Sequence, residues 1–145
     1  MKLFTCLALP ALALAGPSII MGSMYLLDVP TKCHPYMLNV KGTAIVAKEG
    51  LQFYDYDKDT QTLKVHDEDA YVSVDEQGKL VLSSQPHGGF RWGTQVGEYK
   101  RFLSYGDNSI FQLFRDLSVG IGSDCKETRD VRVIFEDAIQ PCEDK

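Results

Sequence analysis

The stretch YVSVDEQGKLVLS at residues 71–83 decides the fold class. Two valines precede the turn signal Asp75–Gly78 and two leucines follow it, and in each pair the apolar residues stand two positions apart. Such alternation is typical of a half-buried strand, and a cluster of Asp, Glu, Gln and Gly is typical of a tight turn. The stretch therefore predicts two antiparallel strands joined by a turn.

The same pattern extends in both directions along the chain. At 145 residues the chain is expected to form one domain, and it shows no internal repeat. Residues 110–117 fit a helical period as well, but flanking glycines and aromatic content favour a strand that runs into a turn. Short strands at this spacing predict an all-β fold, an antiparallel β-sandwich or barrel. Further strands are expected at Ile19 to Leu27, Leu51 to Tyr56, Leu63 to Val65, Phe90 to Trp92 and Val131 to Glu136.

Composition excludes some classes of protein. The formal charge is −5 and the pI is about 5.1, whereas a nucleic-acid binder needs a basic face that neutralises phosphates. Apolar residues make up 44% and charged residues 24% of the chain, which is typical of a globular protein. We therefore expect a folded protein that does not bind nucleic acid.

The first fifteen residues have the pattern of a signal peptide. A positive start precedes an apolar run, Leu3–Leu14, and Ala13-Leu-Ala15 offers the small residues of a cleavage site. The mature domain is then residues 16–145, beginning at Gly16. The alternative is an uncleaved anchor that continues to Leu27, but prolines and glycines interrupt that longer run. We expect secretion to the cell exterior or cell wall, without a membrane anchor after cleavage.

Secretion makes the cysteines candidates for a disulfide. Cys33, Cys125 and Cys142 remain after cleavage, an odd count, and none has the spacing of a zinc ligand. If the first and last strands are antiparallel neighbours, Cys33 and Cys125 reach the same end of the sheet. We predict this pair, with Cys142 free. Parallel neighbours would favour Cys33 with Cys142, and pairing Cys125 with Cys142 requires both flanks to fold back.

Three aspartates have the spacing of a calcium-binding loop. Asp55, Asp57 and Asp59 match its first ligands, but Thr60 stands where the loop needs glycine and His66 where it needs a bidentate glutamate. We therefore expect no metal site. The favoured interpretation is a hairpin tip whose aspartates cap backbone amides.

No catalytic constellation is evident in the sequence. The histidines at 34, 66 and 87 lie far apart, and a triad of Ser83, His87 and an aspartate lacks the context of an activated nucleophile. We expect neither an enzyme nor a cofactor.

One aromatic pair is a candidate binding surface. Phe90 and Trp92 lie two residues apart and so share one face of the expected strand. Such a pair can form a stacking platform for a sugar ring. The alternative, which we favour, is core packing, because a single tryptophan in a small β domain usually supplies buried area.

Short motifs at the start, middle and end of the chain carry a family resemblance. The start has Gly22–Leu27, His34–Pro35, Val40–Ala44 and Leu51–Tyr54; the middle has Ala70–Asp75 and Gly78–Leu80; the end has Ile110–Leu113, Cys125 and Val131–Glu136. Together they resemble small fungal secreted cell-wall proteins, namely the phialide cell-wall protein family and the But2-like domains. The end is similar also to the C-terminal domain of Pir-type yeast wall proteins.

The resemblance implies a non-enzymatic β-domain of the fungal wall or its surroundings. Its partners would be cell-wall polysaccharide or other wall proteins. Leu113 stands where those families usually carry a cysteine, so their disulfide does not transfer to this chain. The Pir repeat is missing from the sequence, so a covalent link to glucan is not expected. The alternative function is a secreted effector or toxin-like protein that binds a host or competitor target.

Overall fold

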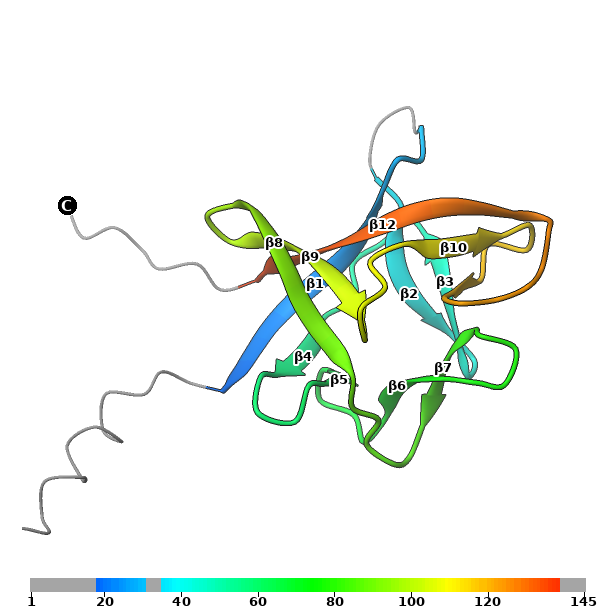
Figure 1. Ribbon diagram of the computed structural model, residues 1–145. Coiled ribbons are helices and arrows are strands. Elements are labelled where there is room, and N and C mark those ends of the chain that lie inside the picture. Colours follow the sequence, from blue (N-terminus) through cyan, green and yellow to red (C-terminus); the bar gives the residue numbers. More distant parts are fainter. Residues whose placement is uncertain (1–17, 31–34, 139–145) are drawn as a thin grey trace, which may run out of the picture.

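The computed structural model describes residues 18–30 and 35–138, and in this part the chain is all-β without a helix. The expected signal peptide lies outside the described residues. Figure 1 shows the strands wrapped around one interior. They are β1 (Ile19–Leu27), β2 (Met37–Lys41), β3 (Ala44–Lys48), β4 (Tyr54–Asp57), β5 (Thr62–Val65), β6 (Tyr71–Val74), β7 (Leu80–Ser83), β8 (Phe90–Gly97), β9 (Lys100–Tyr105), β10 (Phe111–Phe114), β11 (Val119–Gly120) and β12 (Thr128–Asp137).

The strands form a barrel. Antiparallel pairings close a ring in the order β1, β2, β3, β7, β6, β5, β4 and back to β1, while the remaining strands lie outside this ring. The all-β prediction is confirmed, and of its two alternatives the barrel is the one adopted. Residues 110–117 form β10 and the turn that follows it, as the strand interpretation predicts.

The pairings also divide the chain into three similar units of four strands: β1–β4, β5–β8 and β9–β12. The first and fourth strands of the units lie next to one another. The pairs are β1–β4, β4–β5, β8–β9, β9–β12 and β12–β1. The backbone N–H of Phe90 donates to the carbonyl of Gln61 (3.1 Å) and so joins β8 to the start of β5. Each unit's middle strands form a hairpin: β2–β3, β6–β7 and β10–β11.

The three hairpins meet one another through equivalent hydrogen bonds. In each case a carbonyl in the turn of one hairpin accepts a hydrogen bond from a backbone N–H of the next hairpin. The donor lies in the second strand of that hairpin or directly after it. The bonds are Leu82 N–H to Thr43 (2.8 Å), Ile121 N–H to Gly78 (2.6 Å) and Ala47 N–H to Leu117 (2.7 Å). Besides the seven-strand ring, the first and fourth strands of the units form a second circuit of neighbours, β1, β4, β5, β8, β9 and β12. This circuit of six strands, with the three hairpins between them, has the arrangement known as a β-trefoil. The three units repeat in strand pairing and not in sequence, where no internal repeat is found.

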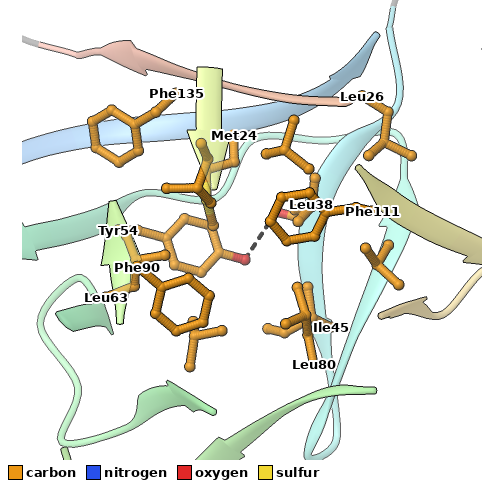
Figure 2. Packing of buried hydrophobic residues seen from close by; sticks show 14 of the residues in the cluster. Met24, Leu26, Leu38, Ile45, Tyr54, Leu63, Leu80, Phe90, Phe111 and Phe135 are labelled. Carbon is orange, nitrogen blue, oxygen red and sulfur yellow. Dashed lines mark hydrogen bonds between the residues drawn. The ribbon is translucent and has the colours of Figure 1, made fainter. Parts of the chain in front are cut away.

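The core repeats with the same threefold pattern but with different side chains. Twelve inward-facing residues, one from each strand, are at most 1% exposed, and many of them are labelled in Figure 2. In unit order they are Met24, Leu63 and Leu103; Leu38, Val72 and Phe111; Ile45, Leu80 and Val119; Tyr54, Phe90 and Val133. The Tyr54 hydroxyl donates to the Leu38 carbonyl (2.9 Å), drawn as the dashed line in Figure 2, so its one polar group is satisfied.

Three aromatic rings, one from each unit, pack against one another. The ring centres of Tyr56 and Trp92 lie 4.6 Å apart, and the Phe135 ring lies 5.6 Å from Trp92 and 6.2 Å from Tyr56. The Arg101 guanidinium lies 3.8 Å from the centre of the Trp92 ring and pairs with Asp137 at 2.7 Å. A cation over the indole face adds to the stacking.

Candidate functional site

Internal symmetry separates the residues that the fold requires from those that it leaves free. The inward-facing positions are apolar in all three units. The residue that follows Tyr54, Phe90 or Val133 faces outward, and its side chain differs from unit to unit: Asp55, Arg91 and Ile134. The residues paired with them on the neighbouring strand differ as well: Lys64 lies opposite Asp55 on β5, and Ser104 lies opposite Arg91 on β9. Because equivalent backbones accept such different side chains, the polar residues on these outer faces are candidates for function.

A pocket of about 310 Å³ lies on the outer face of the β4–β5 hairpin. We call it the β4–β5 pocket. Tyr54 and Tyr56 point inward, so the alternation of the strand places Asp55 and Asp57 outward. The pocket is lined by Asp55, Asp57, Thr60, Thr62 and Lys64, with apolar walls from Ile19, Tyr71 and Pro86.

A histidine fixes the first carboxylate of this pocket. His66 Nδ1 lies 2.9 Å from Asp55 Oδ1 and 3.2 Å from Oδ2, and its Nε2 lies 3.4 Å from Asp67. The Asp55 side chain is 18% exposed. A carboxylate that is largely buried and held by a neighbouring ring keeps one orientation, as a binding site requires.

The other polar groups of the pocket are held close to one another. Asp57 Oδ1 accepts a hydrogen bond from the N–H of Asp59 (2.9 Å), and the hydroxyls of Thr60 and Thr62 lie 2.9 Å apart. In the described part of the chain, neither Asp57 nor Lys64 forms an ion pair within 4 Å. Carboxylate acceptors, hydroxyls and an ammonium donor therefore stand beside an aromatic ring.

The hairpin-tip interpretation of the three aspartates is confirmed at Asp57, which caps a backbone amide. Among residues 18–30 and 35–138, no group of three or more His, Cys, Asp or Glu side chains is arranged to hold a metal ion.

The histidines do not form the triad considered from the sequence. His87 contacts the Ser73 hydroxyl through Nδ1 (3.2 Å) and the Tyr105 hydroxyl through Nε2 (2.6 Å). Ser83 instead accepts a hydrogen bond from the N–H of Gln85 (3.1 Å). His87 therefore ties the β7–β8 loop to β6 and β9, and it does not line the β4–β5 pocket; His34 lies outside the described residues.

The two aromatic residues considered as a sugar-stacking surface or as core packing, Phe90 and Trp92, differ in where they lie. Phe90 is 0% exposed and belongs to the core, so its place as a surface-binding residue is wrong. Alternation along β8 turns the Phe90 side chain toward the core. Trp92 is partly buried under Tyr56 and Arg101, and its indole N–H is buried without a hydrogen-bond partner in the described part of the chain. Trp92 also lines a groove on the β8–β9 hairpin.

The cysteine pairing stays a prediction. Its premise is confirmed, because β1 and β12 are antiparallel neighbours, with Leu27 opposite Arg132. Cys125 is exposed and forms no disulfide within the described residues. Cys33 and Cys142 lie outside them.

Sequence reasoning missed Thr60, Thr62, Ile19 and Pro86 as pocket residues. The two threonines lie in a turn and on a strand, where polar outward residues are ordinary. Ile19 and Pro86 reach the pocket from β1 and from the β7–β8 loop, which are distant in sequence. The signals in the sequence were the calcium-loop spacing, which singled out Asp55 and Asp57, and the alternation around Leu63 and Val65, which placed Lys64 outward.

No family model matches this chain, and no curated protein or solved structure matches it. In the described part of the chain, no helix is long and apolar enough to cross a membrane.

Proposed function

We propose that this chain is a non-catalytic secreted fungal protein of the cell wall or its surroundings, and that it binds wall polysaccharide through the β4–β5 pocket. The observation that carries the proposal is the pocket's lining. Asp55 and Asp57 accept hydrogen bonds, Lys64 donates them and threonine hydroxyls do both, while Tyr71 supplies a flat apolar wall. A sugar ring has the matching chemistry, because its hydroxyls donate and accept and its C–H faces pack on aromatic rings.

The size and rigidity of the pocket support the same ligand class. At about 310 Å³ it lies at the lower end of the range for small-molecule sites. His66 holds Asp55 in place before a ligand arrives, which lowers the entropic cost of binding.

A non-catalytic role is supported by what the polar groups of the site do. His66 is occupied by carboxylates rather than by a hydroxyl or thiol nucleophile. The Ser73–His87 contact lies outside the pocket lining, where a bound sugar would not reach it.

The experiment is a binding measurement on protein purified from the culture fluid. Insoluble β-glucan, chitin and mannan serve as probes in co-sedimentation, followed by calorimetry with a soluble oligosaccharide of the polymer that binds. Asp55→Asn keeps the shape and removes the charge, so we expect at least about tenfold weaker binding, corresponding to one charge-assisted hydrogen bond. Glu127→Gln, at an exposed carboxylate that does not line the pocket, is the control and should bind as the wild type does.

Two results would overturn the proposal. One is failure of the wild-type protein to bind any of the three polymers. The other is binding that Asp55→Asn and Asp57→Asn leave unchanged while both variants keep the wild-type melting temperature. The secreted location is tested by N-terminal sequencing, which should begin at Gly16; protein found only in the cytosol would contradict it.

A protein target, as expected for an effector, has one specific observation in its favour. Leu117 is 40% exposed and adopts a φ of 70°, a conformation that costs a non-glycine residue free energy. Its equivalent in the second unit is a glycine, Gly78. An exposed leucine kept in a strained turn is typical of a contact residue. Leu117→Gly should then abolish capture of a protein target without changing polysaccharide binding.

A further inference from the structure

A groove of about 470 Å³ lies on the outer face of β8 and β9, beside β12. We call it the β8–β9 groove; the residues used below are Arg91, Gly93, Phe102, Ser104 and Arg132. It lies on the hairpin that corresponds to β4–β5 in the next unit, and Arg91 occupies the position of Asp55. The fold therefore presents two outer faces of the same construction but of different charge.

An irregular strand pairing lies at the aromatic residue of the groove, the partly buried Phe102. Trp92 pairs with Leu103 and Gln95 with Arg101, so two residues, Gly93 and Thr94, stand opposite the single residue Phe102. A β-bulge of this kind re-aims side chains and is common next to binding sites. A Cβ on Gly93 would lie 3.4 Å from the Phe102 carbonyl oxygen and 3.7 Å from the Phe102 Cβ, so Gly93 lies directly across from Phe102.

One arginine is positioned beside this ring with donors to spare. Arg132 donates from Nε and Nη2 to the two carboxylate oxygens of Asp28 at 2.8 and 2.9 Å, a bidentate pair. Its guanidinium lies 5.0 Å from the centre of the Phe102 ring. Its third nitrogen, Nη1, has no hydrogen-bond partner among the described residues. The bidentate pair fixes the guanidinium, and Nη1 is left to donate to a ligand.

A second arginine is held only loosely. Arg91 Nη1 lies 3.5 Å from Asp107, whose side chain is fully exposed, while the Arg91 side chain is 52% exposed. Ion pairs between exposed side chains contribute little free energy, so an incoming carboxylate can displace Asp107 at small cost. Hydroxyls of Ser104 and Thr94 also line the groove and suit a sugar ring.

We propose that the β8–β9 groove is a second ligand site, which takes an acidic saccharide: a sugar ring against Phe102 with its carboxylate on Arg91 and the free Nη1 of Arg132. The site does not depend on the function proposed for the β4–β5 pocket. The two sites would let one molecule hold neutral and acidic polymers together.

The probes are sodium glucuronate, glucose and sodium acetate, each titrated into the ¹⁵N-labelled full-length mature protein. Backbone amide shifts locate the site, and fluorescence of the single tryptophan, which lines the groove, provides a second readout. We expect glucuronate to shift the amides of Gly93, Thr94 and Ser104 and to bind at least about tenfold tighter than either glucose or acetate, the equivalent of one charge-assisted hydrogen bond.

Four variants separate the contributions. Arg91→Gln should remove the preference for glucuronate over glucose, and Arg91→Lys should restore part of it. Phe102→Leu should weaken glucuronate and leave acetate unchanged. Asp55→Asn, in the other site, should leave glucuronate binding as in the wild type.

Several outcomes would overturn the inference. Equal affinity for glucuronate and glucose would show that no charge is recognised, and acetate as tight as glucuronate would show that no sugar ring is bound. Shifts confined to the amides of β4 and β5 would place the ligand in the other pocket. If the wild-type protein binds a wall polymer but does not bind glucuronate, the β8–β9 site is disproved and the function proposed for the β4–β5 pocket is not.

Discussion

Replacing Gly78 with alanine should destabilise the protein more than the same change at Gly42, although both glycines lie in hairpin turns with positive φ. The φ angles are 82° at Gly78 and 63° at Gly42. An alanine in this region costs about 1–2 kcal/mol, and its more restricted unfolded chain returns about 0.4–1 kcal/mol. For Gly42→Ala, whose Cβ would meet nothing within 4 Å, the expected net loss is about 0.5–1 kcal/mol.

Gly78 carries an additional cost because another hairpin approaches it closely. A Cβ there would lie 2.7 Å from the carbonyl oxygen of Ile121, so the backbone has to move apart. That movement weakens the hydrogen bond from Ile121 N–H to the Gly78 carbonyl (2.6 Å). A hydrogen bond of this kind contributes about 1 kcal/mol, and adding it to the net loss at Gly42 gives a total expected loss of about 1.5–2 kcal/mol.

Urea denaturation of the wild type and both variants measures the difference. The slope of free energy against urea should stay constant while the midpoints move, by about two- to threefold more for Gly78→Ala. Equal losses for the two variants would refute the reasoning, because they would mean that the hairpins do not approach one another at this point.

Three other results are expected. Tyr54→Phe should cost about 1 kcal/mol in the same urea assay, because it removes a buried hydrogen bond to a β2 carbonyl; an unchanged midpoint would contradict it. The hydrogen bond from Arg132 lowers the pKa of Asp28 in the folded protein below its value of about 3.8 in the unfolded chain. The Asp28–Arg132 pair therefore stabilises the fold fully above the unfolded pKa, and this stabilisation is lost as the pH falls through the folded pKa. The stability advantage of wild type over Asp28→Asn should therefore shrink on acidification below pH 4, and a constant difference would count against the pair. Peptide mapping without reduction should give one linked peptide joining Cys33 and Cys125; any other linked pair disproves that assignment.

The sequence predicts those strands in which apolar residues alternate on both sides of a clear turn signal. The second unit is the clearest case, because valines and leucines alternate on both sides of Asp75–Gly78, and the structure has β6 and β7 there. β9 was not anticipated, since Phe102 and Leu103 stand next to each other and blur the alternation. β2 and β3 were missed as well, because β3 presents a nearly continuous apolar run.

The threefold arrangement could not be read from the sequence because equivalent positions share only apolar character. Tyr54, Phe90 and Val133 occupy one such position, and all three are fully buried. Packing requires that each fills its space, not that the three be alike. The candidate site was predicted in part: the aspartates were recognised, whereas its walls come from segments that only the closed barrel brings together.

The adjacency of β1 and β12 has a consequence for the order of the chain. The N–H of Ala138 donates to the carbonyl of Met21 (2.9 Å), and Figure 1 shows both strands leaving the barrel on the same side. A short linker between residues 19 and 138 should therefore join the two ends without disturbing the core. New ends could then be opened in the β8–β9 turn, between Gly97 and Lys100, to give a circular permutant that begins with the third unit and ends with the second. Because the three units pair in the same way around the molecule, the order in which they follow one another along the chain should matter little for stability.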